Sequence, residues 1–234
     1  MQYPLTEDIG APELFVGRKK EFAMLDEWVK LIPKRLGKSK ALFSRKKGGK
    51  TSLVQRLFNR LWSENGPVVP FFISIEDTEI WLSDFAIKYY QTFASQYISF
   101  LERIEKYAVN LLTLDEILEY GKNHNLDLFE RDVNSLKENE SNKRYDLMWH
   151  TACSAPKRYA SVLDTRFLVI IDEFQFLSKY ITIDQENNIP KKTLPGSYHH
   201  LSESKIAPML ITGSYVNYMV LEWQKRPENF LQTY

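Results

Sequence analysis

The chain has a single cysteine, Cys153, among its 234 residues. An intrachain disulfide and a cysteine-rich zinc site are therefore excluded. We expect Cys153 to pack as a small hydrophobic side chain rather than to act as a nucleophile. There is also no run of about 18 apolar residues, the length that a transmembrane helix needs, and the acidic N-terminus, with Glu7 and Asp8, is unlike a signal peptide. We therefore expect a cytoplasmic protein that does not enter the membrane.

The chain has little net charge, +1 at neutral pH, which argues against bulk affinity for nucleic acid. The charge is nevertheless uneven, because residues 1–60 hold 14 of the 31 Lys and Arg but 6 of the 30 Asp and Glu. A basic first quarter suits phosphate binding and is also compatible with contact to a polyanion such as DNA. An apolar content of 44% and a charged content of 26% are typical of a globular domain with a substantial core.

Glycine is scarce as well, with nine residues, but two adjacent glycines lie in a basic loop at residues 44–51, Ser-Arg-Lys-Lys-Gly-Gly-Lys-Thr. A short apolar run precedes this loop, and a helical pattern follows it. The phosphate-binding pattern G-x-x-x-x-G-K-[ST] is matched at Gly49, Lys50 and Thr51, whereas Ser44 replaces the first glycine. If residue 44 must adopt the left-handed conformation, serine costs about 1–2 kcal/mol there, which is roughly tenfold in affinity.

Two adjacent carboxylates form the second distinctive feature. Residues 167–171 are apolar and predict a strand that is buried on both faces, and Asp172 and Glu173 follow directly. Carboxylates at the end of a buried strand are costly without cationic partners. A magnesium ion and an activated water are the partners found there in P-loop enzymes. An acidic rim exposed to solvent is the alternative interpretation.

Hydrophobic periodicity predicts the remaining elements. We expect helices from residue 22 to 32, from 51 to 62, from 79 to 106, from about 145 to 163 and from 215 onward, and strands at 40–43, 68–75 and 207–212. The aromatic stripe of the 79–106 helix predicts a core position, and Pro70 places the 68–75 strand at or near a sheet edge. A capping box, Thr113 with Glu116, precedes a short helix, and residues 121–143 are expected to form an exposed polar insertion or connection. This order predicts an α/β fold with a mainly parallel sheet flanked by helices.

Four segments together carry a resemblance: residues 15–21 (Phe-Val-Gly-Arg-Lys-Lys-Glu), the loop at 44–51, residues 167–175 and residues 208–214. They resemble the P-loop AAA+-related ATPases of prokaryotes, in particular the archaeal-type/STAND group, which is similar to origin-recognition initiators in its GR-x-x-E box. The resemblance covers roughly residues 12–225. It implies a three-layer P-loop NTPase fold in which the 207–212 strand separates the 40–43 strand from the 167–173 strand, and the 68–75 strand neighbours the latter.

The resemblance also implies a domain organisation. Residues 1–37 would be an N-terminal lead-in and the helix of the GR-x-x-E box, and residues 38–234 would be the ATPase core, with a helical and polar insertion at about 106–145. AAA+ proteins continue into a fifth strand and a C-terminal lid that carries a further nucleotide sensor. We expect this chain to end before both.

The family's site residues can be transferred position by position. ATP phosphates would bind to the loop residues Ser44, Arg45, Lys46, Lys47, Gly48, Gly49, Lys50, Thr51 and Ser52, with Gly17 and Arg18 near the adenine and ribose. Lys50 would contact the β- and γ-phosphates, and Mg²⁺ would be held by the Thr51 hydroxyl and by Asp172. Glu173 would orient the attacking water. Either Thr212 or Ser214 would sense the γ-phosphate, and the resemblance does not choose between them.

We therefore expect an ATP-binding protein, an Mg²⁺-dependent ATPase that converts ATP to ADP and acts as a nucleotide-controlled switch with a protein partner or as a homo-oligomer. Two alternatives stay open. The basic first quarter is compatible with a DNA-associated initiator or defence component. Ser44 and the early end are compatible with a degenerate P-loop domain that serves only as an interaction scaffold.

Overall fold

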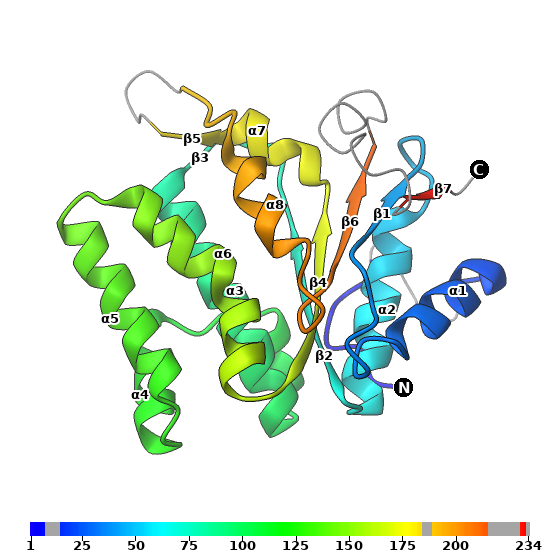
Figure 1. Cartoon of the computed structure of the whole chain (residues 1–234), viewed down its shortest axis with the longest axis horizontal. Coiled ribbons are helices and arrows are strands. Elements are labelled where there is room, and N and C mark those ends of the chain that lie inside the picture. The colour runs from blue at the N-terminus through cyan, green and yellow to red at the C-terminus, as the bar shows by residue number, and fades with distance from the viewer. Residues whose placement is uncertain (8–14, 184–188, 215–229, 233–234) are drawn as a thin grey trace.

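A five-stranded parallel sheet forms the centre of the protein (Figure 1). The computed structural model describes residues 1–7, 15–183, 189–214 and 230–232. The strand order is β2-β4-β6-β1-β7, with β1 at Lys40–Phe43, β2 at Val68–Ser74, β4 at Arg166–Asp172, β6 at Met209–Gly213 and β7 at Phe230–Gln232. Every described pairing in this sheet is parallel. The expected order of the first four strands and the edge position of the strand with Pro70 are confirmed.

Helices cover both sides of the sheet, which makes a three-layer α/β arrangement (Figure 1). In Figure 1, α1 and α2 lie on one side, and α3 and α6, with α4 and α5 beyond them, lie on the other. The helices are α1 at Lys19–Val29, α2 at Lys50–Glu64, α3 at Leu82–Glu102, α4 at Leu114–Asn123, α5 at Asp127–Ser141, α6 at Tyr145–Val162, α7 at Leu177–Tyr180 and α8 at Tyr198–Leu201, with short 3₁₀ turns at Glu105–Ala108, Phe174–Phe176 and Leu194–Ser197. None of the described helices is long and apolar enough to cross a bilayer.

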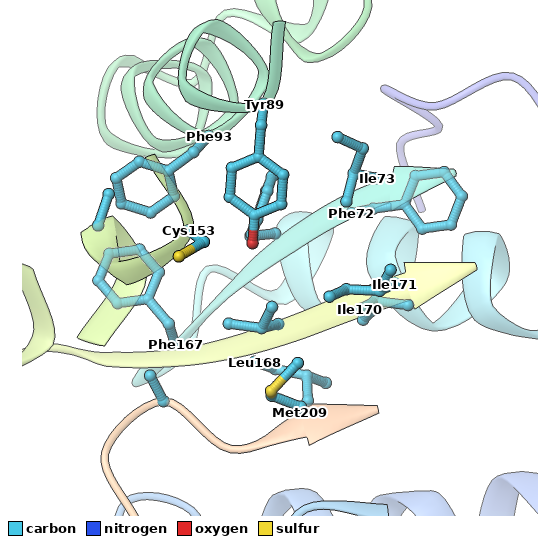
Figure 2. Packing of buried hydrophobic residues seen from close by; sticks show 14 of the residues in the cluster. Phe72, Ile73, Tyr89, Phe93, Cys153, Phe167, Leu168, Ile170, Ile171 and Met209 are labelled. Atoms are coloured by element: carbon cyan, nitrogen blue, oxygen red, sulfur yellow. The ribbon is translucent and has the colours of Figure 1, made fainter. Parts of the chain in front are cut away.

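The aromatic residues of α3 form the core on their side of the sheet (Figure 2). The Phe93 ring packs edge-to-face against Tyr159 of α6, with ring centroids 5.0 Å apart, and lies 5.4 Å from the Phe167 ring of β4. Cys153 is buried beside them, and burial raises the pKa of its thiol to about 12, so it packs as a small hydrophobic residue as expected. The expected core role of the aromatic helix is confirmed. This helix begins at Leu82 rather than at 79, because residues Ile80–Trp81 form β3, which pairs with β5 at Ile181–Thr182.

The expectation of an exposed polar insertion at residues 121–143 is wrong. Most of that segment is α5, whose Phe129, Val133 and Leu136 are buried at helical spacing. Inside this packing, Asp132 accepts two hydrogen bonds from the Arg158 guanidinium of α6, each 2.8 Å long. The abundant charges of the segment concealed a narrow apolar stripe. The preceding capping box of Thr113 and Glu116 is present as predicted.

The expectation that the chain ends before a fifth strand is also wrong. β7 pairs in parallel with β1, placing Phe230 beside Ala41 and Gln232 beside Phe43. Three residues are too few to show a strand periodicity, so the sequence carried no signal for β7. The helix that was predicted from residue 215 onward lies outside the described residues.

The N-terminal segment is fixed to α2. The Asn59 side chain accepts a hydrogen bond from the Leu5 backbone N–H at 2.9 Å and donates one to the Leu5 carbonyl at 3.0 Å. Two residues on, the Glu7 carboxylate is fully buried and accepts two hydrogen bonds from the Arg56 guanidinium, 2.6 and 2.7 Å long. Residues 1–7 therefore stabilise the helix that begins at Lys50.

Candidate functional site

Three separate parts of the sequence meet at the carboxyl edge of the sheet. Because β4, β6 and β1 are parallel and adjacent in that order, the residues at and just after their C-terminal ends lie at the same edge. These residues are the loop at 44–49, the carboxylates Asp172 and Glu173, and the hydroxyl side chains Thr212 and Ser214. The fold thus brings the predicted loop and the predicted acidic pair into one site.

The loop between β1 and α2 is left-handed at Lys47, with φ of 63°, and at Gly49, with φ of 71°. Ser44 is not among the described residues with positive φ, so the conformational cost that we attached to this serine does not arise there and falls on Lys47 instead. At Gly48, an added Cβ would lie 2.9 Å from the Arg45 carbonyl oxygen and would also meet the Ser44 side chain. The second glycine of the pair is required by conformation and the first by close packing.

Lys50 turns its ammonium group into the loop. The side chain is almost fully buried, and its Nζ donates to the carbonyl oxygens of Ser44 and Arg45, both at 3.3 Å, and to Ser214 Oγ at 3.1 Å. All three acceptors are uncharged, and none of the ion pairs in the described part of the chain includes Lys50. A buried cation without an anionic contact is placed to accept one.

Asp172 lies beside the first turn of α2. Its carboxylate accepts a hydrogen bond from Thr51 Oγ1 at 2.7 Å and another from the Thr212 hydroxyl. Burial raises the pKa of Asp172, and the neighbouring Glu173 raises it further, although the two hydroxyl donors act in the opposite direction. The charge of Lys50 also acts to lower this pKa, but burial outweighs it, so a further cation beside the carboxylate would favour its charged form.

The donor set around Asp172 fits magnesium. One carboxylate and one hydroxyl suit an ion that keeps several waters and completes its shell with phosphate oxygens. The described residues contain no group of three or more His, Cys, Asp or Glu side chains able to hold a metal. An Mg²⁺ ion at Thr51 and Asp172 would need further ligands, such as water or phosphate oxygens.

Glu173 has a left-handed backbone, with φ of 53°, and its side chain is tied to two neighbours. Ser214 Oγ donates to the Glu173 carboxylate, 3.0 Å from one oxygen and 3.3 Å from the other, and the Gln175 amide donates to it as well. Since Lys50 Nζ donates to Ser214, this serine links the lysine to the glutamate. Gln175 was not predicted as a site residue, although its position two residues after the acidic pair was the available signal.

Gly17 and Arg18 precede α1 in left-handed conformations, with φ of 84° and 57°. The Arg18 guanidinium donates to the Gly48 carbonyl of the loop and pairs with Glu21 at 2.7 Å. The GR-x-x-E box thus contacts the loop directly and fixes its own arginine through the glutamate three residues later. The resemblance had placed this box near the adenine and ribose.

Thr212 and Ser214, which the sequence could not separate, occupy different places. Thr212 is fully buried, donates to Asp172 and accepts from the Glu173 backbone N–H at 3.3 Å, whereas Ser214 is half-buried between Lys50 and Glu173. The side chains of the other predicted loop residues lie nearer the surface. Those of Arg45, Lys46 and Lys47 are exposed, and Ser52 is half-buried in the first turn of α2.

Compared with known proteins, the chain matches no family model, no curated protein and no solved structure. A function for this chain is therefore inferred from the residues and geometry of the site.

Proposed function

We propose that the chain binds Mg²⁺·ATP and hydrolyses it, as a nucleotide-controlled switch module. The observation that carries the proposal is the buried Lys50 ammonium at the start of α2, whose hydrogen-bond acceptors among the described residues are all neutral oxygens. The next residue, Thr51, donates a hydrogen bond to Asp172. A phosphate group would supply the anion that Lys50 has no contact with. Magnesium would supply the cation that the buried carboxylate favours.

The N-terminus of α2 supports phosphate binding. This helix has 15 residues, no acidic residue in its first turn and no side-chain hydrogen bond at its N-cap, Gly49. The first N–H groups of a helix have no acceptor within the helix, and together with its dipole they favour an anion at that end. Lys50 adds a full charge at the same place, so the β- and γ-phosphates would be held by backbone and side chain together.

The acidic pair supports hydrolysis as well as binding. Thr51 and Asp172 would hold Mg²⁺, which neutralises charge on the transferred phosphoryl group. Glu173 is the next residue along the chain and would accept a proton from the attacking water, as a positioned general base. The preference for ATP over other nucleotides comes from the resemblance carried by Gly17, Arg18 and the two motifs.

Calorimetry with Mg²⁺·ATP tests the proposal directly. The native protein should bind, Lys50→Ala should lose binding, and Lys40→Ala, a partly buried lysine at the opposite end of β1, should retain it. Glu173→Gln should bind normally while its turnover falls about 10²-fold or more, the range for a positioned base. Full binding by Lys50→Ala, or no binding by the native chain, would exclude the proposed function.

One observation favours a second ligand class. The exposed side chains of Arg45, Lys46 and Lys47 extend the basic surface next to the site, as a DNA-associated component would require. Retention of duplex DNA on filters over a salt series tests this, since phosphate contacts give an affinity that falls steeply with salt. Absence of salt-dependent retention leaves the nucleotide as the ligand of this loop.

A further inference from the structure

Gln175 is a buried polar residue that has no role in the mechanism proposed above. It lies in the 3₁₀ turn directly after Glu173 and is 6% exposed. Its side-chain amide donates to Glu173 Oε2. Because an ionised carboxylate can only accept hydrogen bonds, the amide must face Glu173 with its NH₂ group and turn its carbonyl oxygen away.

That carbonyl oxygen, Oε1, is buried and accepts no hydrogen bond from the described part of the chain. A buried acceptor without a partner costs about 1–3 kcal/mol, whereas an apolar side chain of similar shape carries no such cost. A glutamine at this position therefore opposes the stability of the fold. The side-chain hydrogen bond that it does form with a described residue, the donation to Glu173, is the property that an apolar residue lacks.

The Glu173 carboxylate needs a fixed donor because its other partner is shared. Ser214 has one hydroxyl proton, which it donates to Glu173 while it accepts from Lys50. A phosphate oxygen beside Lys50 would compete for that proton, and of the two described side-chain donors to Glu173 the Gln175 amide would then remain. The backbone of Glu173 adds to this need, since its left-handed conformation is held by the surrounding contacts rather than by its own preference.

We propose that Gln175 is a positioning residue, whose amide holds the Glu173 carboxylate facing Ser214 and Lys50 during ATP hydrolysis. This inference rests on the proposed ATPase function. It assigns to Gln175 no contact with nucleotide. A misplacement of a reacting group by about 1 Å can lower a rate by about 10²-fold, so loss of the amide should affect turnover and leave nucleotide affinity unchanged.

The test is Gln175→Met, which keeps the length of the side chain and removes the amide. We expect kcat for ATP hydrolysis to fall about 10- to 100-fold, with the Kd for Mg²⁺·ATP within about twofold of the native value because the residues that hold phosphate are unchanged. The control is Gln91→Met on α3, whose amide donates to the Leu112 carbonyl at 3.1 Å, far along the chain from the site. This control should leave kcat unchanged.

A second readout needs no nucleotide. The side-chain NH₂ signals of Gln175 in a ¹H–¹⁵N spectrum can be assigned by their loss in Gln175→Met. A hydrogen bond to a carboxylate is charge-assisted and short, so Glu173→Ala should move the bonded Gln175 proton upfield while the Gln91 signals stay in place. Unmoved Gln175 signals would refute the contact itself.

The possible outcomes separate the two proposals. A native chain that does not bind Mg²⁺·ATP refutes the proposed function, whereas the NMR result still reports on the Gln175 contact. A native chain that hydrolyses ATP, with an unchanged kcat in Gln175→Met, refutes the positioning role alone. If Gln175→Met lowers the affinity for Mg²⁺·ATP and the melting temperature together with kcat, Gln175 has a structural role. This result also refutes the inference.

Discussion

The phosphate-loop pattern has glycine at the position of Ser44, whereas in the structure the non-glycine residue of the loop with a left-handed conformation is Lys47. Three substitutions distinguish these positions: Ser44→Gly, Lys46→Gly and Lys47→Gly. The two lysines are neighbours and both are exposed, so Lys46→Gly and Lys47→Gly each remove one exposed positive charge and add one glycine. Lys46 is not among the described residues with positive φ, so the pair differs mainly in backbone conformation.

The expected magnitude follows from that difference. Relief of a left-handed conformation at a non-glycine residue is worth about 1–2 kcal/mol, and the entropy lost by glycine on folding, about 0.5–1 kcal/mol, affects both variants alike. Lys47→Gly should therefore exceed Lys46→Gly in free energy of unfolding by about 1–2 kcal/mol. For a chain of this length each kcal/mol moves the melting temperature by about 2–4 °C. Ser44→Gly should give no gain.

Urea and thermal unfolding, followed by circular dichroism, measure these differences. A midpoint that moves while the m-value stays constant reports a change in stability alone. Equal midpoints for Lys46→Gly and Lys47→Gly would refute the strain at Lys47. A gain in Ser44→Gly of the size expected for Lys47→Gly would restore the first expectation, that Ser44 occupies a glycine position.

Three further predictions concern buried charges. Burial raises the pKa of Asp172 above its usual 3.8, so the folded chain binds that proton more tightly than the unfolded chain. The stability that results is present below pH 3.8 and is lost as the pH rises through the folded-state pKa. Asp172→Asn should therefore gain stability relative to the native chain as the pH rises, which urea titrations over a pH series would show, while a constant difference would contradict it. Arg158→Leu should lose about 3 kcal/mol because it leaves Asp132 buried and unpaired, and adding Asp132→Leu should recover part of this loss in the same assay. Glu7→Ala should likewise cost about 3 kcal/mol, the range for breaking a buried ion pair, because it removes the buried carboxylate that accepts two hydrogen bonds from Arg56 of α2. A loss below about 1 kcal/mol, the value of a surface pair, would show that the N-terminal segment does not hold the helix.

Much of the central sheet was predictable because its strands are short, apolar and separated by helical patterns. Residues 167–171 are apolar throughout and form the central part of β4, buried on both sides by helices. The order of the first four strands came from the resemblance and agrees with the structure. The segments that were misjudged have weak local signals, since α5 has only four buried apolar residues among many charges and β7 has three residues.

In the site, residue types were predictable and their contacts were not. The pattern selected Lys50, Thr51, Asp172 and Glu173 as the groups that phosphate and magnesium chemistry would need, and the structure brings all four to one edge of the sheet. Their roles toward phosphate and magnesium stay a prediction. The contacts of Arg18 with Gly48 and Glu21 depend on how α1 packs near the loop, which no local pattern records. The contact of Gln175 with Glu173 was not predictable either, because it depends on the orientation of the Glu173 side chain.

The choice between Thr212 and Ser214 illustrates what three-dimensional structure adds. The two residues are two positions apart, so an extended chain directs both side chains to the same face of the sheet. The two residues differ in burial. Thr212 is 0% exposed, and if its hydroxyl broke the hydrogen bond to Asp172, a buried carboxylate oxygen would lose that donor. Ser214 is half-buried and can exchange hydrogen-bond partners. Ser214 alone touches both Lys50 and Glu173. Under the proposed function, we infer that Thr212 fixes the magnesium ligand and that Ser214 responds to the γ-phosphate.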